Sequence, residues 1–242
     1  MLQQYVLTIF LAGLAIAEVP SYFDVCGRRN PNLNDCVLKS VVKMKDKLRN
    51  GIPELDIPSI EPLTLDEIRL ADEPSFKAIA QNVKLYGFPD FEVKSLRCDL
   101  KNQRFDIEVS FKRINLSAEY DVATRVVVPI AGKGPINIIA EDVDAKVTLK
   151  YRLIDHKGAK YLFFPTMVTK LNIRDYTSHF VSREGSDGAL AEGINAALSQ
   201  SRQEILATII PNLEKVVSER ILHMTNRICK HFVYDEILPD RE

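Results

Sequence analysis

The sequence predicts an α+β fold in which a long, strongly curved antiparallel β-sheet wraps around one long C-terminal α-helix, with a short helix near the N-terminus. Two patterns carry this prediction. Between Phe76 and Phe180 apolar and polar residues alternate, which is typical of strands with one buried face. From Leu190 to about Phe232 apolar residues recur with helical spacing. Each element offers one apolar face, so we expect them to share one core.

Composition limits the class of protein. The chain has 242 residues, of which 46% are hydrophobic, and its formal net charge is −1. These values exclude collagen-like, low-complexity and fully disordered proteins. The 32 basic and 33 acidic residues nearly cancel, which argues against a dedicated nucleic-acid binder. Four cysteines are too few for a disulfide-built scaffold, so the fold must rest on a large apolar core.

Residues 1–17 have the features of a secretory signal peptide. They contain no charged side chain, residues 5–14 are largely apolar, and residues 15–17 supply the small side chains that signal peptidase requires. The apolar stretch is shorter than the roughly 20 residues that span a bilayer. We therefore predict a signal peptide over 1–17 and a single secreted, extracellular domain over 18–242, with no membrane span.

The four cysteines fall into two pairs of different character. Cys26 and Cys36 stand ten positions apart in a turn-rich segment, and secretion favours their pairing. Such a bridge would contribute about 2–3 kcal/mol on the loop-entropy account. Cys98 and Cys229 either form a second, long-range bridge or remain buried thiols. Both alternatives stay open, because four cysteines allow three pairings.

An amphipathic helix follows the cysteine loop. Apolar residues from Val37 to Leu48 have helical spacing and alternate with lysines, for which a solvated face is the expected place. Asn34 is the candidate N-cap, and Gly51 is a natural stop. Residues 51–66 contain three prolines, which remove amide donors, so we predict an extended connector there.

Three segments show the strand pattern most clearly. They are residues 105–111, residues 116–122 and residues 143–153, each with every second side chain apolar. The apolar positions shift by one residue between Ala140 and Val143, and we predict a β-bulge at that point. Strands this long must bend to cover a core, so the sheet should be strongly curved and solvated on its outer face.

The last element is a helix of unusual length. About forty residues at 1.5 Å each would extend about 60 Å, more than the width of a compact domain of this size. Ser199, Ser201 and Thr208 interrupt any strict heptad, which argues against a coiled coil. The sheet is therefore predicted to wrap this helix around a long, narrow, apolar interior.

Several motifs in this order resemble the Takeout / juvenile hormone-binding protein family of secreted insect proteins. The motifs are the Cys26 and Cys36 pair, the connector IPELDIPSIEPLTLDEI, the block VVVPIAGKGPINIIAEDVDAKVTLKY with Gly132 and Gly134 in its turn, and the C-terminal segments LATIIPNLEKVV and VYDEILPD. The resemblance covers nearly the whole predicted mature chain, from about residue 20 to residue 240.

The resemblance implies a tubular lipid-binding fold that carries a juvenile hormone-like terpenoid or a fatty acid-like lipid in an elongated cavity. It implies no catalysis. We also expect no cofactor, and we expect the protein to be a monomer. Two departures favour an unidentified apolar ligand over juvenile hormone itself. Ser199 and Arg202 stand where members often carry Asn and Trp, and Cys98 and Cys229 do not match the family's second disulfide.

From the resemblance and the strand pattern we predict which side chains line the cavity, with the Tyr120 hydroxyl as the preferred donor to the ligand. The predicted lining residues are Val41, Phe105, Val109, Tyr120, Val126, Val128, Phe163, Phe164, Ile194, Leu198 and Ile205.

Other functions receive less support from the residues. The chain has no G-x-S-x-G elbow, no phosphate loop and no H-E-x-x-H motif. His223, Cys229 and His231 fit no recognised ligand spacing, so we expect no metal. Asn115 begins the only glycosylation sequon. The alternative to a carrier is a secreted signalling or chemosensory protein that acts through a surface partner.

Overall fold

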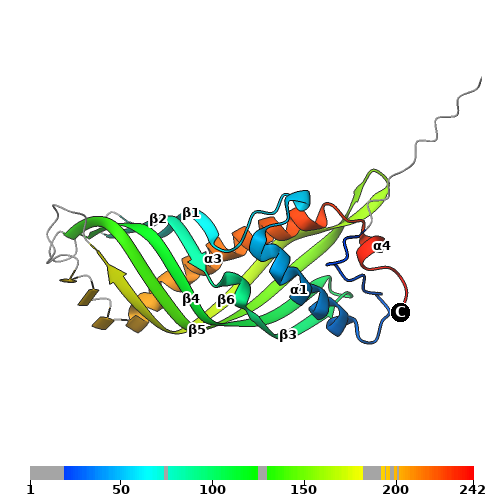
Figure 1. Ribbon diagram of the computed structural model, residues 1–242, viewed down its shortest axis with the longest axis horizontal. Helices are drawn as coiled ribbons and strands as arrows, with labels where there is room; N and C mark the ends of the chain where they lie inside the picture. The colour runs from blue at the N-terminus through cyan, green and yellow to red at the C-terminus, as the bar shows by residue number, and fades with distance from the viewer. Residues whose placement is uncertain are drawn as a thin grey trace, which may run out of the picture.

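The computed structural model describes residues 19–73, 76–124, 130–181, 192–193, 195–196, 199–200 and 202–242, so the predicted signal peptide lies outside it. A six-stranded antiparallel sheet curls into a half-barrel, and a long C-terminal helix lies along it (Figure 1). The predicted fold class is therefore confirmed.

The described elements follow one another along the chain as follows: α1 (Leu33–Asn50), η1 (Pro53–Leu55), β1 (Leu63–Glu73), β2 (Phe76–Tyr86), η2 (Phe88–Asp90), β3 (Glu92–Asp99), β4 (Arg104–Thr124), β5 (Ile130–His156), β6 (Ala159–Phe180), α3 (Arg202–Cys229) and α4 (Tyr234–Ile237). The sheet order is β1-β2-β4-β5-β6, and β3 pairs with the first part of β4.

The N-terminal helix begins one residue earlier than its predicted cap. Asn32 is the N-cap, and it makes no side-chain capping bond. Asn34 instead lies inside the first turn, where its Oδ1 accepts a hydrogen bond of 2.8 Å from the Cys98 amide of β3. The residue predicted to cap α1 therefore ties α1 to the sheet. Gly51 ends the helix as predicted, with a φ of 86°.

The prediction missed β1 in the connector region. The connector is not extended throughout, because Pro53–Leu55 form the 3-10 helix η1 and Asp56 has a left-handed φ of 56°. The chain then enters the sheet at Leu63 and pairs with β2 along the whole of β1. The β1 residues Leu63 and Leu65 are buried, and so is Ile68, one position out of their alternation. This change of parity hides the strand pattern from a period-two search.

The strand β4 is one continuous strand where two separate strands were predicted. Residues 105–111 and 116–122 both belong to β4, and the inward face changes from odd to even positions between 111 and 114. The same change occurs on β5 between 143 and 140, and on β6 between 173 and 176. Pairing of the three strands passes this level without a register shift, so the predicted β-bulge is wrong. No bulge is needed because the three neighbours change parity together.

We call this level of the sheet the crease, which comprises residues 112–113, 141–142 and 174–175. On each strand both crease residues are exposed. Asp142 has a positive φ of 50°, which accommodates the change of parity. Ion pairs cross the crease from β4 to α3: Arg113–Glu141 at 2.9 Å, Asp142–Arg174 at 2.8 Å and Asp175–Arg202 at 2.9 Å.

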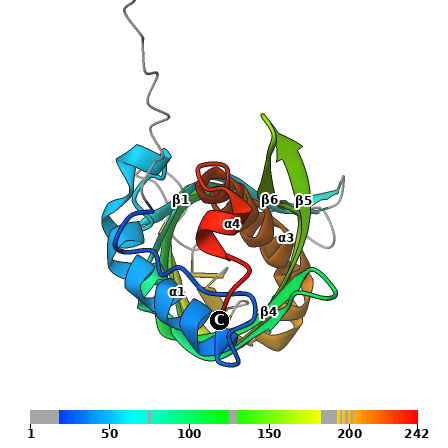
Figure 2. The ribbon, with the colours of Figure 1, turned by 90° about the vertical axis from the view of Figure 1, so that its right-hand side faces the viewer.

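The helix α3 closes the gap between β1 and β6, the two edge strands of the half-barrel. Seen end-on in Figure 2, it completes a ring with the sheet. The Asn226 side chain accepts from the Phe164 amide at 2.8 Å and donates to the Phe164 carbonyl at 2.9 Å, as a neighbouring strand would. On the other edge, Asn212 donates to the Leu70 carbonyl at 2.9 Å. These bonds satisfy edge groups that otherwise invite pairing with another chain.

One end of the ring is covered by a plug, which we define as residues 22–36 and 232–241 (Figure 2). The predicted Cys26–Cys36 disulfide is present in it. The Cys26 amide donates to the Ile237 carbonyl at 3.0 Å, and the rings of Phe23 and Phe232 stack at 5.2 Å. The two ends of the described chain are thus joined across one end of the barrel.

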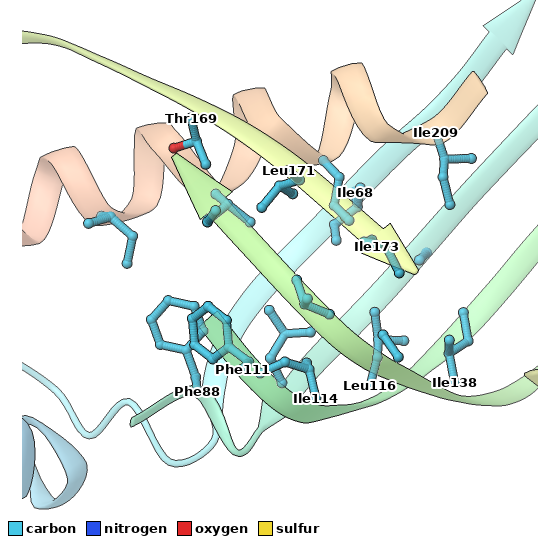
Figure 3. Close-up of a pocket in the computed structure, with 18 of the residues that line it drawn as sticks. Ile68, Phe88, Phe111, Ile114, Leu116, Ile138, Thr169, Leu171, Ile173 and Ile209 are labelled. Atoms are coloured by element: carbon cyan, nitrogen blue, oxygen red, sulfur yellow. The ribbon is translucent and has the colours of Figure 1, made fainter. Parts of the chain in front are cut away.

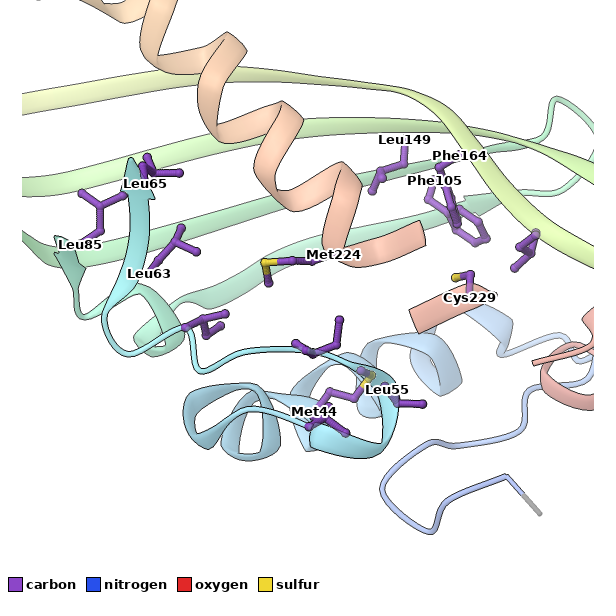
Figure 4. Close-up of a cluster of buried hydrophobic side chains, with 14 of the residues drawn as sticks. Met44, Leu55, Leu63, Leu65, Leu85, Phe105, Leu149, Phe164, Met224 and Cys229 are labelled. Carbon is purple, nitrogen blue, oxygen red and sulfur yellow. The ribbon is translucent and has the colours of Figure 1, made fainter. Parts of the chain in front are cut away.

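Behind the plug the barrel is filled by an aromatic cluster of Phe105, Tyr151 and Phe164. Their ring centroids lie 5.4 to 6.1 Å apart. Burial, together with the hydrogen bond to Tyr234 of the plug, raises the pKa of Tyr151 above its ordinary value. Figure 4 shows Phe105 and Phe164 together beside Leu149, on the strands that face Met224 of α3.

Candidate ligand-binding cavity

Beyond the aromatic cluster the interior of the barrel is hollow. A cavity of about 460 Å³ lies between the inner face of the sheet and α3. Figure 3 shows side chains from several strands and Ile209 of α3 turned toward this space. The inward positions of β1, β2, β4, β5 and β6 all contribute to the wall, so the alternation that builds the core also builds the cavity.

The wall is apolar throughout its described part. Among the described residues that line the cavity none is Asp, Glu, Lys, Arg or His. Hydroxyl groups are the only polar side chains there, and they belong to Tyr120, Thr169, Tyr176, Ser178 and Thr225. Such a wall suits a neutral hydrocarbon chain, because burying an unpaired charge in it would be very costly.

Two of these hydroxyls are already engaged with the protein. Ser218 of α3 donates to Thr169 of β6 at 2.8 Å, and both residues are buried. The Thr225 hydroxyl donates to the Ile221 carbonyl in its own helix at 2.9 Å. The first bond joins α3 to β6, and both bonds satisfy these hydroxyl groups without a ligand.

The helix α1 covers the side of the cavity. Val41 and Leu48 line the wall from α1, next to Phe88 and Phe91 around η2. Lys45 fixes this cover, since its ammonium donates to the Phe91 carbonyl at 2.6 Å. Lys45 therefore holds α1 against the segment around η2, in addition to contributing to a solvated face.

Tyr120 occupies a distinctive place on the wall. It is only 5% exposed, and its ring packs edge-to-face against Phe180 at 4.8 Å. The ring also lies over Gly134, where a Cβ would come within 3.2 Å of it and 2.3 Å of the Val181 carbonyl, so a larger residue does not fit. Burial raises the pKa of Tyr120, aided by nearby Glu119, which keeps the phenol protonated as a hydrogen-bond donor.

The structure places four of the predicted lining residues on the wall: Val41, Val109, Tyr120 and Ile205. Four more predicted lining residues, Val126, Val128, Ile194 and Leu198, lie outside the described residues.

Three predicted lining residues lie away from the wall. Phe105 and Phe164 belong to the aromatic cluster, where they pack against each other and leave no space for a ligand. Phe163 packs under the Arg152 guanidinium, which lies 5.1 Å from the ring centroid. Consecutive residues of a strand point to opposite faces, so Phe163 and Phe164 do not share one.

Sequence reasoning missed the part of the wall that comes from β1, β2 and η2. Ile68 and Leu70 lie on the unrecognised strand β1, and Phe88 follows the unrecognised end of β2. Figure 3 shows Phe88 beside Phe111 of β4, with ring centroids 5.6 Å apart. A search that allowed one change of parity within a strand, as was noticed on β5 between Ala140 and Val143, could have found β1.

The remaining predicted features concern metals, thiols and membranes. In the described part of the chain no three His, Cys, Asp or Glu side chains gather as a metal site would require. Cys98 and Cys229 are free thiols, and burial raises their pKa values to about 11 and about 12. None of the described helices is long and apolar enough to cross a membrane.

Comparisons with known proteins agree with this geometry. The family model for haemolymph juvenile hormone binding protein (JHBP) matches residues 5–239. The chain is 21% identical over 213 residues to the circadian clock-controlled protein daywake of Drosophila melanogaster, a match that covers 83% of this chain and 82% of that protein. The Drosophila yakuba protein of the same name matches equally. The crystal structure of Epiphyas postvittana Takeout 1 superposes with a TM-score of 0.76 at 14% identity, over 89% of this chain and 99% of that one.

Proposed function

This chain belongs to the haemolymph juvenile hormone binding protein family, and from that membership we propose that it is a secreted carrier of one small hydrophobic ligand. The observation that carries the proposal is the apolar cavity of about 460 Å³, whose described wall has no charged side chain. The ligand is a juvenile hormone-like terpenoid or a fatty acid-like lipid. Its role is transport, not catalysis, in keeping with a family of binding proteins.

The shape of the cavity favours a long, single-chain ligand. The α3 residues on its wall run from Ile205 to Ile228, which is about 35 Å of helix at 1.5 Å per residue. A volume of about 460 Å³ spread over that length is narrow, so two acyl chains side by side do not suit it.

Burial of the ligand supplies the affinity. Removing about 300 Å² of apolar surface from water at roughly 25 cal/mol/Å² contributes about 7 kcal/mol before the costs of association. One or two polar contacts then set orientation without adding much affinity.

The central test is to identify what the protein carries. Chain secreted by insect cells is purified without detergent, and its extracted lipids are analysed by mass spectrometry. We expect close to one equivalent of a long, single-chain apolar compound. Empty protein that also fails to bind apolar fluorescent probes would rule out a carrier.

Tyr120 is proposed as the group that orients the ligand. Tyr120→Phe keeps the ring and its contact with Phe180, so we expect unchanged stability. Affinity for an ester or epoxide ligand should fall about tenfold at most, because one hydrogen bond contributes about 0.5–1.5 kcal/mol. Affinity for a plain hydrocarbon of equal length should not change. Titrations with both ligands measure this, and Tyr161→Phe, which is not on the wall, is the control. Equal affinity of Tyr120→Phe and the parent chain for the ester would remove Tyr120 from the site.

A further inference from the structure

The single sequon of the chain lies in the middle of the sheet's outer face. Asn115 is on β4, where Ile114 and Leu116 point into the cavity, so Asn115 points outward. Its side chain is exposed, and its side-chain amide makes no hydrogen bond to another described residue. Ser117, two residues later, points to the same outer face.

The two residues that flank Asn115 across the sheet are both exposed and apolar. Tyr86 of β2 pairs with Asn115 on one side, and Ile139 of β5 pairs with it on the other. Tyr86 is 38% exposed and Ile139 is 37% exposed. They are two of the seven large hydrophobic residues that are exposed in the described part of the chain. Directly paired side chains stand about 4.5–5.5 Å apart, so the three form one continuous row.

The rows on either side of this one are polar. On one side is the crease, where Arg113 and Glu141 form an ion pair at 2.9 Å. On the other side Ser117 is paired with Lys84 and Asn137. The apolar side chains of Tyr86 and Ile139 thus flank Asn115, and polar rows border them on both sides. A group attached to the Asn115 side chain could cover both apolar side chains.

We infer that Asn115 carries an N-linked oligosaccharide whose first sugar lies against Tyr86 and Ile139. The ring faces of hexoses present C–H groups, which pack on an aromatic ring or an aliphatic side chain. The sugar then removes both apolar side chains from water. Because Asn115 is on the outer face and the cavity is on the inner face, the oligosaccharide leaves the ligand-binding space free.

The attachment requires a donor and a compartment. The donor is a lipid pyrophosphate-linked oligosaccharide of the secretory pathway. The Asn115 Nδ2 forms a bond to the anomeric carbon of the first sugar and loses one proton. The bond between that carbon and the pyrophosphate oxygen breaks, and the lipid pyrophosphate leaves with the electron pair. The oligosaccharide is transferred while the chain enters the secretory pathway, before the sheet forms. A sequon within a strand is therefore still accessible at that stage. The inference rests on the proposed secretion.

Occupancy is tested on the full chain made by secreting insect cells. Intact mass is measured before and after treatment with an N-glycanase, and the N-terminus is determined on the same sample. We expect a chain that starts after Ala17 and carries one releasable oligosaccharide. Ser117→Ala should abolish the oligosaccharide, and Ser117→Thr should retain it. A processed, ligand-loaded chain without an oligosaccharide overturns this inference alone. A chain that keeps residues 1–17 and stays in the cell overturns the proposed secretion, and the modification with it.

The contact with Tyr86 and Ile139 has its own test. The glycosylated chain is compared with Asn115→Asp, which has the same polypeptide as the enzymatically deglycosylated protein. We expect the glycosylated form to melt about 2–4 °C higher. In a chain that also carries Tyr86→Ser and Ile139→Ser, the difference between the two forms should vanish. A difference of equal size in both backgrounds would overturn the contact.

Discussion

The end of the barrel at the plug is filled with side chains, and the neighbouring region encloses the cavity. The strands β4, β5 and β6 contribute to both regions. Along β4 the inward side chain changes from Phe105 to Ile107, and along β5 from Tyr151 to Leu149. At the solid level the inward residues are aromatic and their rings touch. At the hollow level most are aliphatic, and Ala80, Ala140 and Ala145 are among the smallest.

The difference shows that the alternation of apolar and polar residues and the size of the inward side chains control separate properties of the barrel. Alternation decides which side chains face inward, and both regions have it. The volume of those side chains decides whether they meet in the middle. Protein interiors are close-packed, so small residues at several levels of the wall leave space that larger side chains would fill. The cavity is therefore encoded by a shortage of side-chain volume.

The largest effect should come from removing an aromatic ring at the solid end. Phe164→Ala deletes a buried ring, and we expect a loss of about 3–5 kcal/mol in the free energy of unfolding, measured by urea denaturation. Phe163→Ala is the matched control, because its ring lies outside the core, and it should cost less than about 1 kcal/mol. Equal losses for the two variants would contradict the assignment of a solid core at this level.

The next effect concerns the covalent tie of the plug. The double variant Cys26→Ser and Cys36→Ser should lose about 2–3 kcal/mol of stability, because the unfolded chain regains the freedom of the closed loop. Mild reduction of the parent chain should lower its melting temperature to that of the double variant, and should leave the melting temperature of the double variant unchanged. If reduction has no effect on the parent, the disulfide does not stabilise the plug.

The smallest effect separates the hollow region from a packed one. Ala145→Phe places a ring in the cavity from β5, and we expect affinity for an apolar probe to fall about tenfold, or about 1.4 kcal/mol. Stability should hold or rise, because the ring enters empty space.

Lys146→Phe is the control for this variant, since its side chain points to the outer face, where Lys146 pairs with Glu108. It should leave probe affinity unchanged. A loss of stability of about 1–3 kcal/mol in Ala145→Phe, the usual cost of overpacking, would show that the region is already filled.

Much of the fold could be predicted from the sequence, because long elements with one apolar face leave few ways to bury it. The curved sheet and the long helix follow from the spacing of apolar residues, and the Cys26–Cys36 bridge was favoured by its turn-rich segment and by the predicted secretion. The strand β1 was not recognised, because prolines dominate the preceding segment and the inward face of β1 changes parity after Leu65, which breaks a strict period of two.

The site was harder to predict than the fold. Phe105 and Val109 stand on one face of one strand, yet Phe105 packs in the core and Val109 lines the cavity. That distinction depends on what lies opposite each residue across the barrel, and a single strand contains no information about it.

The crease has a consequence for how such a sheet can change in evolution. Deleting Asp142 alone would turn the part of β5 beyond it inside out, with its polar face toward the cavity and its apolar face toward water. The neighbouring strands β4 and β6 change parity at the same level. They would keep their original faces, so the reversed part of β5 would no longer match them. Point substitutions can accumulate freely in these strands, but insertions and deletions at this level must occur in three strands at once. Length changes are therefore expected in the turns, while the three strands keep a common length on each side of the crease.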